Sequence, residues 1–115
     1  QDETRFCFLH GLGGVGKSEL AIRFANNHRK EFSLVCFFPA SNDQLLYQEY
    51  QELAKRLNIP FSDQDGLDVL QKRIHSHLEQ TPAYHPYLLI FDNVEKEMDP
   101  QAFPQRGGAI LMTSR

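Results

Sequence analysis

The chain has 115 residues and a formal net charge of −3; hydrophobic residues make up 41% and charged residues 23%. This length suits one domain, covering residues 1–115, and the composition is that of a folded chain with a core. The slight acidity argues against a nucleic-acid or anionic-membrane surface as the main purpose, and no apolar run is long enough to span a bilayer. Cys7 and Cys36 each lie inside an apolar run, which predicts buried, reduced thiols and favours a reducing, cytoplasmic compartment.

The first predicted element is a strand at residues 6–9, followed by a helix that begins around Lys17 and closes with the cationic residues 28–30. One face of this helix is apolar and carries Leu20, Ala21, Phe24 and Ala25. A second strand is predicted at residues 34–38. The helix after it opens at Ser41-Asn42-Asp43-Gln44, a sequence typical of a capping box, and stops at Asn58 and Pro60.

A third helix is predicted from about Leu67 to Leu78, then strands at residues 87–91 and 109–112, joined by a polar, proline-containing loop over residues 95–108. The four apolar runs are continuous rather than alternating, which is typical of parallel strands covered on both faces. This order predicts an α/β domain with a mostly parallel sheet. Ligands of such sheets bind at the edge where the strands have their carboxyl ends.

Residues 11–18, Gly-Leu-Gly-Gly-Val-Gly-Lys-Ser, match the phosphate-loop pattern G-x-x-x-x-G-K-[ST] in full. Glycines let such a loop curl so that backbone N–H groups point at phosphate oxygens, and the following helix adds its positive end. Lys17 is predicted to reach the β and γ phosphates, and Ser18 to ligate Mg²⁺. The candidate nucleotide-binding residues are therefore Gly11, Gly13, Gly14, Val15, Gly16, Lys17, Ser18 and Glu19.

Two further strand ends carry candidate chemistry. Asp92 ends the apolar run of residues 88–91, where a carboxylate can hold Mg²⁺ through the water shell of the metal. Arg115 follows the last apolar run and would face the γ-phosphate from a neighbouring strand, the alternative being a solvated terminal side chain. Glu95 is close enough in sequence to Asp92 to act as a spare carboxylate. The three remaining candidates for metal chemistry lack a ligand pattern and are predicted to lie at the surface: His75, His77 and His85.

Together, residues 11–21, 88–95 and 110–115 resemble the NB-ARC family, the STAND signal-transduction ATPases found in plant resistance proteins, apoptosis activators and bacterial regulators. The resemblance covers nearly the whole chain. It implies a P-loop NTPase fold of three α/β/α layers, truncated after the strand that carries Arg115, with that strand lying between the first strand and the Asp92 strand. It also implies a Walker A loop at residues 11–18, the Walker B magnesium carboxylate at Asp92, and a γ-phosphate sensor at Arg115.

The resemblance further implies an ATP/ADP switch with Mg²⁺, working beside helical, winged-helix and repeat sensor domains of a longer protein; it leaves homo-oligomer formation on activation open. Catalytic roles would fall to Lys17, Asp92 and Arg115. Asn93 stands where many relatives carry a second acid, which predicts slow hydrolysis, and whether the full-length protein is an ATPase stays open. The alternatives are a P-loop kinase that transfers phosphate to a small acceptor, or a remnant that no longer binds nucleotide; the intact Gly11–Ser18 motif argues against the remnant.

Overall fold

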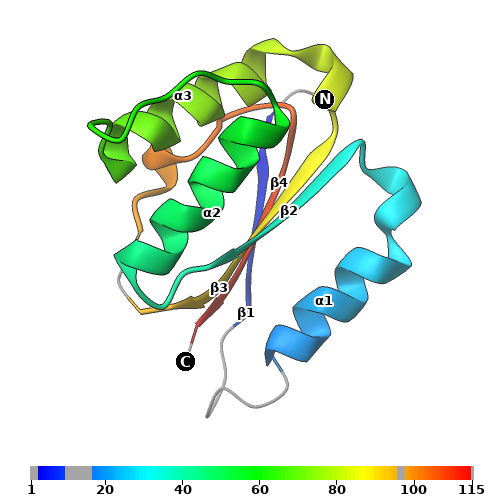
Figure 1. Cartoon of the computed structure of the whole chain (residues 1–115). Coiled ribbons are helices and arrows are strands. Elements are labelled where there is room, and N and C mark those ends of the chain that lie inside the picture. The colour runs from blue at the N-terminus through cyan, green and yellow to red at the C-terminus, as the bar shows by residue number, and fades with distance from the viewer. Residues whose placement is uncertain (1–2, 10–16, 96–97, 115) are drawn as a thin grey trace.

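The structure is a computed structural model and describes residues 3–9, 17–95 and 98–114. Strands and helices follow one another along these residues in the predicted order (Figure 1): β1 (Arg5–Leu9), α1 (Lys17–Asn27), β2 (Leu34–Pro39), α2 (Asp43–Arg56), α3 (Leu67–Gln80), β3 (Tyr87–Val94) and β4 (Gly108–Ser114). Short 3₁₀ turns precede β2, β3 and β4: η1 (Arg29–Glu31), η2 (Pro82–Tyr84) and η3 (Pro100–Ala102). The first helix ends three residues before its predicted cationic end, because Arg29 and Lys30 belong to η1.

The described strands form one parallel sheet in the order β1-β4-β3-β2. The last strand of the sequence therefore lies between the first strand and the strand of Asp92, as the family resemblance implies. Leu9 on β1 is in register with Thr113 on β4, and Pro39 on β2 with Asp92 on β3. Both β1 and β2 are edge strands of the sheet that the described residues form.

The sheet is covered on both faces, which confirms the predicted three layers. Side chains of β3 alternate between two apolar cores: Leu89 and Phe91 pack under α2 and α3, whereas Leu88 and Ile90 pack toward α1. Figure 1 shows α2 and α3 on one side of the sheet and α1 on the other. Burial of consecutive residues in β3 explains why its sequence is an unbroken apolar run. Of the helices within the described residues, none combines the length and hydrophobicity that crossing a bilayer requires.

Helix α2 begins within the predicted sequence, but its N-cap is Asn42, one residue after the Ser41 that a capping box would use. The side chain of Asn42 accepts a hydrogen bond from the N–H of Leu45 at 2.9 Å, which satisfies one of the donors left free in the first turn. Leu46, Tyr50 and Leu53, spaced by four and three residues, are buried against the sheet. The chain leaves the helix through Asn58, whose φ of 58° is left-handed.

The prediction that His75 lies at the surface is wrong, since only 5% of the residue is exposed. Its Nδ1 lies 3.0 Å from the carbonyl oxygen of Ala102, and its Nε2 lies 2.6 Å from the hydroxyl of Tyr50. A carbonyl can only accept, so Nδ1 carries the proton and Nε2 accepts from Tyr50. Because both ring nitrogens have partners, the neutral ring can be buried, and it ties α2 and α3 to η3.

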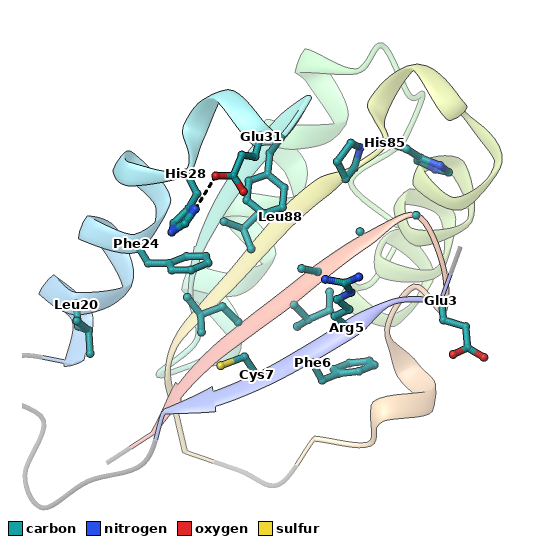
Figure 2. A pocket seen from close by; sticks show the side chains of 17 residues that line it. Glu3, Arg5, Phe6, Cys7, Leu20, Phe24, His28, Glu31, His85 and Leu88 are labelled. Atoms are coloured by element: carbon teal, nitrogen blue, oxygen red, sulfur yellow. Dashed lines mark hydrogen bonds and ion pairs between the residues drawn. The ribbon is translucent and has the colours of Figure 1, made fainter. Parts of the chain in front are cut away.

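Cys36 is buried as predicted, but the prediction that Cys7 is buried is wrong. Helix α1 packs over β3 and β4 through Ala21 and, among the described residues, leaves β1 uncovered on this side. A groove of about 870 Å³ remains between α1 and the strands β1 and β4, with Cys7 on its floor (Figure 2). Leu20 and Phe24 line it and stay 50% and 41% exposed, so the predicted apolar face of α1 is only partly buried.

Candidate functional site

The carboxyl ends of the four strands lie along one edge of the sheet because all strand pairs are parallel. β1 ends there at Leu9, and α1 begins at the same edge with Lys17, so the two flank the phosphate-loop sequence (Figure 1). The ends of β3 and β4 bring Asp92 and Thr113 to this edge. The large groove beside α1 is a different place, since it extends toward the amino ends of β1 and β4, at Arg5 and Gly108.

Asp92 is held by the strands on both sides of it. Its carboxylate Oδ1 accepts a hydrogen bond from the hydroxyl of Thr113 on β4 at 2.6 Å. Its backbone carbonyl accepts from the N–H of Ala40, just after β2, at 2.8 Å. Only 6% of Asp92 is exposed. The carboxylate is therefore buried and held in place at the end of a central strand. A surface carboxylate without these partners would rotate freely.

Thr113 was not a candidate on sequence grounds, and the structure places it against Asp92. It is 1% exposed, and besides donating to Asp92 its Oγ1 accepts a hydrogen bond from the N–H of Asn93 at 2.9 Å. The sequence does hold a signal: a hydroxyl residue directly follows the apolar run of residues 109–112, at the edge of the sheet where the phosphate loop is predicted.

Asn93 interrupts the regular pairing of β3. Its φ of 60° is left-handed, a conformation that Asn tolerates better than most residues, and the register between β3 and β4 shifts between Phe91 and Val94. The kink turns its backbone N–H toward Thr113. Glu95, the spare carboxylate, is exposed one residue beyond β3. Asn93 therefore lies at the bend itself, and Glu95 lies two residues beyond it.

Several predicted site residues lie outside the described residues: Gly11, Gly13, Gly14, Val15, Gly16 and Arg115. Lys17 and Ser18 form the start of the α1 backbone, but their side chains are likewise outside what the structure describes. Glu19 lies in the first turn of α1 and is exposed. The structure thus brings Asp92, the start of α1 and the end of β4 to one edge, and the roles of the individual loop residues stay predictions.

The part of the chain that the structure describes contains no group of three or more His, Cys, Asp or Glu side chains that could hold a metal. A magnesium ion in a phosphate site does not need one, because it is bound by one or two protein oxygens, several waters and the substrate phosphates. The single fixed carboxylate of Asp92 is a hard oxygen donor and fits that requirement.

A family model described as NB-ARC domain matches residues 1–115. No curated protein matches the chain at a significant level. The matched range covers the phosphate-loop sequence, Asp92 and the end of β4 in one continuous stretch.

Proposed function

The chain belongs to the NB-ARC domain family, whose members are nucleotide-binding modules of signalling ATPases, and on this premise we propose that it is an ATP/ADP-binding regulatory switch. Residues 1–115 form one P-loop NTPase domain of a longer cytoplasmic protein. The nucleotide state biases how this domain packs on helical, winged-helix and repeat sensor domains of the same protein.

The observation that carries the proposal is the buried Asp92 carboxylate, held at the edge where the phosphate-loop sequence joins β1 to α1. In the proposed site, backbone N–H groups of Gly11 to Gly16 would surround the phosphates and Lys17 would pair with the β and γ phosphates. Ser18 and Asp92 would hold Mg²⁺, which supplies positive charge against the phosphates when bound. Arg115, one residue beyond β4, would sense the γ-phosphate.

The kinase alternative has the same phosphate site and differs in needing an acceptor pocket. Among the described residues, the groove beside α1 is lined mainly by apolar side chains and extends from Leu20, at the start of α1, toward the amino ends of β1 and β4. A small polar phosphate acceptor is poorly matched to a mainly apolar lining. Family membership and this lining both favour the switch.

Isothermal calorimetry on the full-length protein tests the proposal. Mg²⁺-ATP and Mg²⁺-ADP should both bind, and Lys17→Ala should weaken ATP binding by about 10-fold or more, because charge-assisted hydrogen bonds to phosphate are lost. Lys72→Ala, at an exposed position of α3, is the matched control and should bind like the wild type. Equal affinity of the wild type and Lys17→Ala for ATP would overturn the proposal.

A further inference from the structure

We propose that Thr113 is a positioning residue for Asp92, and that its hydroxyl sets how tightly Mg²⁺ is held together with the nucleotide. The inference rests on the proposed function and deepens it, because it concerns the magnesium side of the same site. Thr113 would touch neither metal nor nucleotide and would act through Asp92 alone.

The direction of the two hydrogen bonds follows from their chemistry. The backbone N–H of Asn93 can only donate, so it uses a lone pair of Thr113 Oγ1 at 2.9 Å. The single hydroxyl proton is then left for Asp92 Oδ1, at 2.6 Å. Because threonine is β-branched, its χ1 rotation is restricted, and the side chain is packed in the interior, with 1% exposed. The carboxylate is thus anchored through a rigid donor.

The location of Thr113 connects this anchor to the nucleotide loop. Its backbone is in register with Leu9, the last residue of β1 before the phosphate-loop sequence, while its side chain reaches Asp92 on the other neighbouring strand. One residue therefore bridges the start of the loop and the magnesium carboxylate. Partners that orient a metal ligand in this way usually change metal affinity by 10–100-fold when they are removed.

The test compares Thr113→Val, which keeps the shape and removes the hydroxyl, with Thr113→Ser, which keeps the hydroxyl. ATP is titrated calorimetrically into the nucleotide-free full-length protein at a series of MgCl₂ concentrations and in EDTA. Adding Mg²⁺ should increase the affinity for ATP, and the Mg²⁺ midpoint is the concentration that gives half of this increase. Thr113→Val should raise the Mg²⁺ midpoint by about 10-fold or more and leave the affinity for ATP in EDTA unchanged. Thr113→Ser should keep the wild-type Mg²⁺ midpoint.

Two controls separate positioning from a loss of packing. Ile110→Val removes one methylene from the buried part of the same strand and should lower the melting temperature without moving the Mg²⁺ midpoint. In the nucleotide-free protein, hydrogen exchange of the Asn93 amide should be faster in Thr113→Val than in Thr113→Ser. Thr113→Ala serves as a second hydroxyl-free variant should Thr113→Val fold poorly.

The outcomes distinguish the inference from the proposed function. A wild type that binds no nucleotide overturns the proposed function, and this inference with it. A wild type with a clear Mg²⁺ dependence that is unchanged in both hydroxyl-free variants overturns the inference alone.

Discussion

The hydroxyl of Tyr50 donates a hydrogen bond of 2.6 Å to Nε2 of His75 in the core between α2, α3 and the sheet. Burial raises the pKa of Tyr50 and lowers the pKa of His75 from 6.5 to about 4, so both rings are neutral at physiological pH. The proton on Nδ1 is used by the carbonyl of Ala102, which leaves Nε2 free to accept. This pair makes the stability of the domain depend on pH.

Stability should fall as the pH drops from about 6.5 to about 4. In this window the unfolded chain binds a proton at His75 and the folded chain does not, so lowering the pH favours unfolding. The pKa difference corresponds to a loss on the order of 3 kcal/mol across the window. Urea unfolding at pH 7 and pH 4.5 measures it. His75→Gln should lose most of this dependence, and His77→Gln should keep it; a His75→Gln variant as pH-sensitive as the wild type would show that other groups are responsible.

Tyr50→Phe should destabilise the domain by about 1–3 kcal/mol, because it leaves Nε2 of His75 buried without a donor while preserving the ring that stacks on Phe38. Urea denaturation at pH 7 gives the difference in the free energy of unfolding. Tyr84→Phe, at a half-buried position of η2, is the matched control and should change little. A loss below about 0.5 kcal/mol for Tyr50→Phe would mean that the hydrogen bond contributes no net stability.

The strands, the helices and the placement of Asp92 at the sheet edge follow from apolar periodicity and the rule for parallel sheets. Strand order does not, because any order of parallel strands gives the same buried runs; it came from the family resemblance and is confirmed. The burial of His75 and the contact of Thr113 with Asp92 could not be predicted from the sequence, for a common reason. Their partners, Tyr50 and Asp92, lie 25 and 21 residues away, and only those contacts make a buried polar side chain acceptable.

Cys7 should react with thiol reagents much faster than Cys36 in the folded chain. Cys7 is exposed on the floor of the groove, whereas Cys36 is buried and its pKa is raised to about 12, which removes the reactive thiolate. Labelling with a chromogenic disulfide should give one rapid equivalent, absent in Cys7→Ser, and a second only in denaturant. Two rapid equivalents in the native protein would contradict the burial of Cys36.

Residues 1–115 on their own should self-associate through the outer edge of β1 and the groove beside it. Within the described residues that edge has no partner strand, and Phe24 and Leu20 remain exposed next to it. Unpaired strands and contiguous apolar surface both promote association. Cys7→Lys places a charge on this surface and should reduce the apparent mass in light scattering. A clean wild-type monomer at high concentration would count against the prediction.

Hydrolysis of ATP should be slow, and Asn93 is the residue that we expect to limit it. The attacking water has to lose a proton; the amide of Asn93 can orient a water but accepts no proton at neutral pH, and absence of a positioned base typically costs about 10²–10⁴-fold in rate. Asn93→Asp should speed single-turnover hydrolysis in the full-length protein, since Asp also tolerates the left-handed φ of 60° at this position.

Two controls test this assignment. Asn58→Asp makes the same change at the other left-handed Asn of the described residues, at the far end of α2, and should leave the rate unchanged. Glu95→Gln should also change little, because Glu95 is exposed beyond the bend. A wild type that turns over several times per second and is inactivated by Glu95→Gln would make Glu95 the base and remove Asn93 from the argument.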